Sequence, residues 1–403
     1  MSLLVSTCFP ILQAYHYHVL PLRHLIVAVD PRSRTSPTFI FNRWRRQGMH
    51  IEEWTDSDFW RPDMKLKPIA DDAELQTKRD RHRGRQKYFY RRCLMHLKQA
   101  NRTFVTLNDS DEYVVYNHAG GENYQAWEAV HQARHEASTL AAKHTRVKPS
   151  QTPPTTAQAG AMLEYIRHEK EAGLEYYQSP CLGIPRLMFG AQQDTDTAEQ
   201  RLKTARAIFD SPDQFDTLRW RHHAHRNDFV KNALGKVIMD VSRIDIAASP
   251  NFMSLHRPIK TICNAPWHND WDSGLRINHY LGDWESYSFR NDARRGGERS
   301  REQWEYKATT AGEETDDNIR PWLDGFVQTH GPAKSKELLG DAGLPASYHS
   351  NTSADTRWSL LPEKLEKILS SDKTVANDNK MVAFDTWVRN KYKDAPTAEG
   401  RRG

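Results

Sequence analysis

Two aspartates separated by one residue follow a predicted buried strand, Arg102–Leu107 (RTFVTL). Alternate side chains of an extended backbone share a face, so the carboxylates of Asp109 and Asp111 are expected to point the same way. Two such carboxylates suit a hard divalent cation, Mg²⁺ or Mn²⁺, which takes oxygen ligands and commonly bridges to a substrate diphosphate. A capped turn without a ligand is the alternative, because short acidic pairs are common at turns.

Acidic residues also follow two earlier predicted strands. Asp30 follows Leu25–Val29, and Asp56 follows His50–Trp54. In α/β proteins ligands bind at the carboxyl ends of parallel strands. We therefore expect Asp30 and Asp56 to help bind a cofactor or substrate beside Asp109.

The predicted helix Gln86–Ala100 precedes the aspartate pair. Its apolar residues recur at steps of three and four, as in an amphipathic helix. Arg85 and Gln86 open this helix, where they are placed to reach a diphosphate or sugar hydroxyls. An ordinary surface start to the helix is the alternative.

The elements that must position these residues alternate between strand and helix along residues 25–107. This rhythm predicts an α/β fold with a mixed, mostly parallel sheet flanked by helices. Residues 118–180 are a predicted insertion, and residues 301–403 a polar, helical C-terminal extension. Further elements are expected as follows: helices at Pro37–Gln47, Leu163–Leu174, Ala198–Phe209, Pro362–Leu369 and Val375–Tyr392, and strands at Thr217–His223, Lys236–Val241, Thr261–Asn264 and Leu275–Leu281.

Composition narrows the class of protein. The 403 residues are 38% apolar and 27% charged, and 57 Lys and Arg against 52 Asp and Glu give a net charge of +5. This excludes a disordered chain and a multi-span membrane protein. The four cysteines lack the spacing of a zinc site, while one or two disulfides remain open. Met1–Leu12 is apolar but too short to span a membrane, and it lacks the basic leader of a signal peptide.

Three segments together carry a family resemblance. They are Ala14–His18 (AYHYH), Asn108–Tyr113 (NDSDEY) and Arg276–Tyr287 (RINHYLGDWESY). With them the sequence resembles the glycosyltransferase family 92-like enzymes, formerly the DUF23 group. The resemblance covers roughly residues 14–300, with 118–180 outside it.

The resemblance implies a GT-A fold and metal-dependent transfer of a sugar from a nucleotide-sugar donor to a glycan or glycoprotein hydroxyl, with inversion. It implies Mn²⁺ or Mg²⁺ as the cation and favours a UDP-sugar over a GDP-sugar. Carried over by position, Asp109 faces the donor ribose or the metal, Asp111 binds the metal, and His279 is a metal or diphosphate ligand. The cation neutralises the leaving nucleoside diphosphate.

An inverting transfer needs a general base for the acceptor hydroxyl. Asp270 and Asp272 are the first candidates, because Trp267 and Trp271 beside them offer faces on which a sugar ring stacks. Asp283 and Glu285 are the second choice. A loop with packed tryptophans is the alternative.

The resemblance begins after the first strand of the family fold, which has no counterpart before Ala14. The acid expected in the first helix is also absent. The second hypothesis is therefore a catalytically inactive remnant that binds glycan or protein. The sequence has no nucleic-acid-binding motif, so we expect no nucleic-acid partner. The resemblance implies the secretory pathway, with a membrane-associated Golgi enzyme, although this chain shows no membrane span.

Overall fold

The protein is described here from a computed structural model. It describes these residues: 8–29, 37–60, 75–117, 155–171, 179–192, 202–226, 229–232, 235–246, 273–289, 299–340 and 342. Several expectations lie outside them, namely those on Asp30, Thr261–Asn264, Asp270, Asp272 and the helices at Pro362–Leu369 and Val375–Tyr392.

The N-terminal part forms a strand–helix–strand unit after helix α1 (Cys8–Val19). Strands β1 (His24–Ala28) and β2 (His50–Trp54) are parallel, and helix α2 (Thr38–Arg45) lies between them in the sequence. Gly48, with φ of 81°, allows the turn from α2 into β2. These elements confirm the expected order of strand, helix and strand.

The remaining strands form two further sheets. The three-stranded sheet has the order β3 (Phe104–Thr106), β8 (Lys236–Asp240) and β5 (Cys181–Ile184). The five-stranded sheet has the order β10 (Glu314–Thr315), β7 (His222–His223), β6 (Arg186–Phe189), β9 (Leu275–Tyr280) and β4 (Glu112–Tyr116).

Strand direction differs from the expectation. The class, mixed α/β, is confirmed, but the mostly parallel sheet is wrong for the described strands. Only β1–β2 and β6–β9 pair in parallel there, and the other pairings are antiparallel. The physical reason is that an apolar run predicts burial on both faces of a sheet, whichever way the neighbouring strands point.

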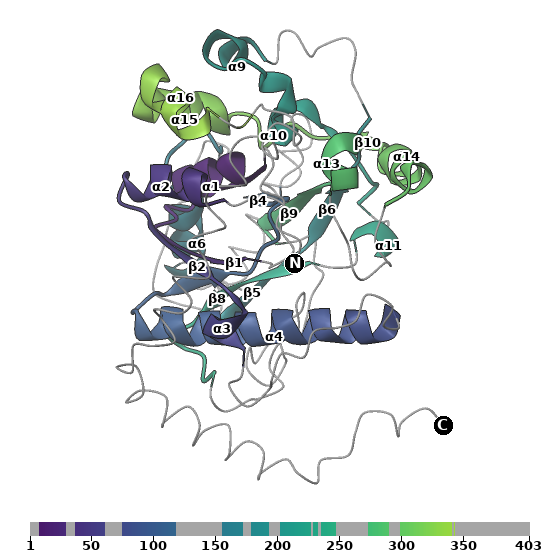
Figure 1. Ribbon diagram of the computed structural model, residues 1–403. Helices are drawn as coiled ribbons and strands as arrows, with labels where there is room; N and C mark the ends of the chain where they lie inside the picture. The colour runs from purple at the N-terminus through teal and green to yellow at the C-terminus, as the bar shows by residue number, and fades with distance from the viewer. Residues whose placement is uncertain are drawn as a thin grey trace, which may run out of the picture. The chain divides into compact units, whose positions relative to one another are not determined.

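Helix α4 (Leu75–Gln99) extends further toward the N-terminus than predicted. Figure 1 shows it running alongside β5 and β8. Its apolar stripe packs against Trp54 of β2 and Met239 of β8 in one core cluster. Because β3 follows α4 after only a few residues, this packing also positions the turn that carries Asp109 and Asp111.

The larger core cluster includes both regions predicted to lie outside the main fold. Helix α6 (Ala161–Glu171), from the expected insertion, contributes Met162 and Ile166. Helices α15 (Trp322–His330) and α16 (Pro332–Leu339), from the expected C-terminal extension, contribute Trp322 and Leu339. The compact unit accordingly continues to Ser350 rather than ending near residue 300.

Shorter helices complete the described part. They are α3 (Asp56–Phe59), α9 (Lys203–Ile208), α10 (Asp216–Arg219), α11 (Phe229–Asn232), α13 (Trp284–Phe289) and α14 (Arg301–Thr310). Helix α10 replaces the first three residues of the strand expected at Thr217–His223, and only His222–His223 form a strand, β7. Asp216 accepts a hydrogen bond from Trp220 Nε1 (3.1 Å) across this helical turn. No helix in the described ranges combines the length and apolarity needed to cross a membrane.

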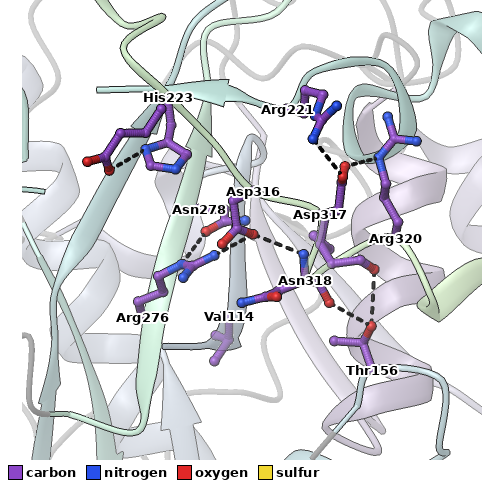
Figure 2. Close-up of polar contacts among 12 residues, drawn as sticks. Val114, Thr156, Arg221, His223, Arg276, Asn278, Asp316, Asp317, Asn318 and Arg320 are labelled. Carbon is purple, nitrogen blue, oxygen red and sulfur yellow. Dashed lines mark hydrogen bonds and ion pairs between the residues drawn. The ribbon is translucent and has the colours of Figure 1, made fainter. Parts of the chain in front are cut away.

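A buried polar network joins the five-stranded sheet to residues 316–320, which follow β10 (Figure 2). The guanidinium of Arg276 on β9 lies 2.7 Å from the carboxylate of Asp316, and Arg276 is fully buried. Asp316 also accepts a hydrogen bond from the backbone N–H of Asn318 (3.0 Å). This network holds the segment before α15 against β9.

Candidate functional site

The turn between β3 and β4 carries the aspartate pair. The backbone N–H of Glu112 donates to the carbonyl of Asp109 (3.2 Å), and Glu112 Oε2 accepts from the N–H of Asp109 (2.8 Å). These bonds form a tight turn, so the expected extended backbone at Asp109–Asp111 is wrong. Asp111 is buried, whereas the side chain of Asp109 is 33% exposed.

Strand β9 places His279 opposite this turn. His279 is the cross-strand partner of Glu112 in the antiparallel β4–β9 pair. Its Nε2 lies 3.6 Å from Asp111 Oδ2, and its Nδ1 lies 3.5 Å from Glu112 Oε1. The structure thus brings together two of the residues expected from the resemblance, Asp111 and His279.

Two cations complete the cluster. Lys236, the first residue of β8, lies 2.8 Å from Glu112 Oε2 and 3.2 Å from Asp109 Oδ2. Arg186 on β6 faces the same nitrogen of His279, Nδ1, at 3.5 Å, and also donates to the carbonyl of Lys231. The cluster therefore contains three acids, a lysine, an arginine and a histidine.

Burial sets the protonation of these groups. It lowers the pKa of His279 to about 4, against the opposing effect of Asp111, so the imidazole is neutral at pH 7. It also raises the pKa of Glu112 to about 7, although the Lys236 ammonium acts in the opposite direction. Burial alone would lower the pKa of Lys236, but Asp109 and Glu112 outweigh it and raise that pKa, so the ammonium stays charged.

The donor set fits a divalent cation in its chemistry. A neutral imidazole can bind metal through Nε2 when its proton is on Nδ1. In His279 that nitrogen faces both Glu112 Oε1 and Arg186 Nη1, each at 3.5 Å, so metal binding would require Arg186 to turn away and leave Nδ1–H to Glu112. Asp109 and Asp111 would add the oxygen ligands that Mn²⁺ prefers. Binding would require Asp109 to turn away from Lys236, because the ligand atoms of Asp109, Asp111 and His279 do not all lie within 4.8 Å of one another.

Other expected residues contact one another instead. Arg85 Nη2 lies 2.6 Å from Asp56 Oδ1, and Asp56 begins helix α3. Asp283 caps helix α13 through the N–H of Ser286 (2.8 Å). Gln86 lies on α4, next to Arg85, and Glu285 is exposed on α13. The expectations for Asp30, Asp270 and Asp272 lie outside the described residues.

Sequence reasoning missed Glu112, Lys236 and Arg186. Glu112 had a local signal, because it directly follows the aspartate pair. Lys236 had a weaker one, a lysine at the start of the apolar run KVIMD. No sequence pattern near Lys236 connects it to Asp109, since their contact spans 127 positions.

No family model, no curated protein and no solved structure matches this chain.

Proposed function

We propose that the protein is a divalent-cation-dependent glycosyltransferase of the GT-A type. It transfers a sugar from a nucleotide-sugar donor, a UDP-sugar rather than a GDP-sugar, to a hydroxyl of a glycan with inversion. One observation supports this most. Two of the three segments that carry the family resemblance, NDSDEY and RINHYLGDWESY, are neighbours through the β4–β9 pairing, which sets Glu112 opposite His279.

The charges of the cluster suit this reaction. A bound Mn²⁺ would neutralise the leaving nucleoside diphosphate, and Asp111 and His279 are the residues to hold it. Lys236 and Arg186 supply positive charge beside them, and charge-assisted hydrogen bonds from such groups stabilise phosphate oxygens. The partial exposure of Asp109 supports its proposed role as a ligand of the metal or of the donor ribose.

We propose Asp270 or Asp272 as the general base. Asp283 is the less suitable candidate, because its carboxylate caps α13.

For localisation we propose the secretory pathway. Cys181 is disulfide-bonded, and disulfides persist in oxidising compartments.

Calorimetric titration tests the donor site. UDP, and separately GDP, is titrated into the full chain with and without Mn²⁺. We expect binding of UDP that requires Mn²⁺ and falls at least about tenfold in Asp111→Asn. Asp210→Asn is the matched control, because its side chain is 83% exposed and, within the part of the chain that the structure describes, its ion pair is with the exposed Lys336. Equal affinity in Asp111→Asn and the wild type would refute the proposed donor site.

A specific observation favours the second function, a remnant that binds glycan without transferring sugar. Lys236 already neutralises Asp109 and Glu112, as a bound cation otherwise would. This alternative requires that neither nucleotide binds with Mn²⁺ while immobilised glycans retain the chain. Hydrolysis of a UDP-sugar by the purified chain, lost in Asp111→Asn, would exclude it.

A further inference from the structure

Three histidines converge on one carboxylate oxygen at the opposite end of the β1–β2 pair from Asp56. His24 and His50 are the first residues of β1 and β2 and are paired in register. Their Nε2 atoms lie 2.7 Å and 3.2 Å from Glu52 Oε1. His96, in the last turn of α4, places its Nε2 2.8 Å from the same oxygen.

This arrangement is crowded for hydrogen bonds alone. A carboxylate oxygen has two lone pairs, and here three imidazole nitrogens approach it. The ring centroids of His24 and His50 are 4.4 Å apart, and the two ring planes lie at 83° to each other. The other oxygen of this carboxylate, Glu52 Oε2, accepts a hydrogen bond from Trp54 Nε1 (3.0 Å), which fixes the orientation of the carboxylate.

The cluster is half open to solvent. The side chain of His24 is 5% exposed and that of Glu52 22%, whereas His50 is 60% and His96 39% exposed. A small ion can therefore enter from the side of His50 and His96. The ligand atoms of His24, His50 and Glu52 all lie within 4.8 Å of one another, which no other three residues with such ligand atoms achieve in the described part of the chain.

We propose that His24, His50, Glu52 and His96 form a zinc site, separate from the cluster around Asp111. Imidazole and carboxylate are zinc ligands, and bonds of about 2.0–2.2 Å in a tetrahedron set the ligand atoms about 3.3–3.6 Å apart. The nitrogens lie 2.7–3.2 Å from Glu52 Oε1, and the ligand atoms of His24, His50 and Glu52 all lie within 4.8 Å of one another, so these three residues can close around an ion by shifts of about an ångström. His96 lies outside that group of three and must move farther to become the fourth ligand. Four protein ligands make a structural site, which joins the end of α4 to β1 and β2.

Arg102 gives the proposal a specific test. Its Nε donates to His24 Nδ1 at 3.3 Å, which places the ring proton of neutral His24 on Nε2. Zinc ligation through Nε2 requires that proton on Nδ1, so Arg102 must turn away. Arg102 is exposed, and it can do so without losing buried packing. Arg102→Gln, whose amide oxygen accepts from Nδ1–H, is therefore expected to bind zinc more tightly.

The experiment is a competition titration of Zn²⁺ alone against a chromophoric chelator. It uses the full chain, stripped of metal, in the Asp111→Asn background so that the other cluster does not contribute. We expect one equivalent of zinc, bound more than about tenfold more weakly in His50→Ala and in His96→Ala. His225→Ala, a histidine with a side chain 50% exposed beside Glu314, is the matched control and keeps wild-type affinity.

Co²⁺ in place of Zn²⁺ gives an independent readout. The absorption bands of tetrahedral cobalt should appear in the parent chain and disappear in His50→Ala, whose far-ultraviolet circular dichroism stays unchanged because His50 is largely exposed. The proposal is overturned if no zinc binds, if His225→Ala weakens binding as much as His50→Ala, or if Arg102→Gln weakens it. Absence of zinc binding would show that the cluster is only a set of hydrogen bonds to Glu52, and either of the other two results would show that these residues do not hold the zinc.

Discussion

The ammonium of Lys236 lies 2.8 Å from the carboxylate of Glu112, and these side chains are only 1% and 0% exposed. Lys236 begins β8 in the three-stranded sheet, and Glu112 begins β4 in the five-stranded sheet. The ion pair therefore joins the two sheets at the turn that carries Asp109. Any change to it acts on the fold and on the candidate site together.

Replacing Lys236 with methionine should destabilise the protein more at high pH than at low pH. Burial already raises the pKa of Glu112 to about 7, and loss of the ammonium raises it further. When the pKa of a carboxyl is higher in the folded protein than in the unfolded chain, the folded protein becomes less stable as pH rises through the folded-state pKa. We expect Lys236→Met to cost about 3–5 kcal/mol at pH 8.5 and less at pH 6, measured by urea unfolding.

The double variant Lys236→Met with Glu112→Gln serves as the control. It removes the acid that is left without its partner, so most of the loss at pH 8.5 should be recovered. A loss that is equal at both pH values, or equal in the single and double variants, would contradict a buried charge pair.

His16 should make the protein less stable in mild acid. Its Nδ1 donates to the carbonyl of Leu12 (3.1 Å) and its Nε2 accepts from the N–H of Val114 (3.2 Å), so both nitrogens are used by the neutral ring. Burial lowers the pKa of His16 to about 4. A lowered histidine pKa gives stability that is present above the unfolded pKa of about 6.5 and lost as pH falls toward 4.

The expected loss attributable to His16 is about 2 kcal/mol between pH 6.5 and pH 5. Urea unfolding at both pH values measures it in the wild type and in His16→Gln, which cannot take up the proton. The difference between the two pH values should shrink by that amount in the variant. An undiminished pH dependence would show that other groups cause it.

Four strands were predicted closely, whereas β4, β5 and β6 were not predicted although each contains a short apolar run. HLIVA, HIEEW, KVIMD and LRINHY form β1, β2, β8 and β9 within a residue or two of the expected bounds. The start of α4 was not predictable from its apolar stripe, because the N-terminal half of this helix is polar. Strand direction was not predictable either, since burial of a run does not depend on the direction of its neighbours.

The candidate site was predictable only in its local part. Asp111 and His279 stand in motifs with recognisable neighbours, and the structure places them together. Lys236 and Arg186 reach the site by pairings between strands distant in the chain, as in the β6–β9 register of Met188 with His279. Composition and spacing do not encode such pairings. The same holds for His96, which meets Glu52 from another element.

Asp316→Ala should be far more destabilising than Asp317→Ala. Asp316 is the partner of fully buried Arg276 at 2.7 Å (Figure 2), so its removal leaves an uncompensated charge and should cost about 3–5 kcal/mol. Asp317, 42% exposed, pairs with Arg221 (3.1 Å) and Arg320 (2.7 Å) nearer the surface and should cost about 1 kcal/mol or less. Urea unfolding of both variants at pH 7 measures the difference, and equal losses would refute it.

Two glycine-to-alanine changes, at Gly325 and at Gly84, should change the stability of the protein in opposite directions. A methyl group at Gly325 in α15 would meet the carbonyl of Ala157, which cannot withdraw freely because it is hydrogen-bonded to His18 Nε2 (2.9 Å). Gly325→Ala should therefore cost about 1–3 kcal/mol, as overpacking does. At Gly84, inside α4, the nearest atom to such a methyl is a Trp60 ring carbon at 3.8 Å. Gly84→Ala should stabilise by about 0.4–1 kcal/mol, and destabilisation there would show that α4 is not helical at Gly84.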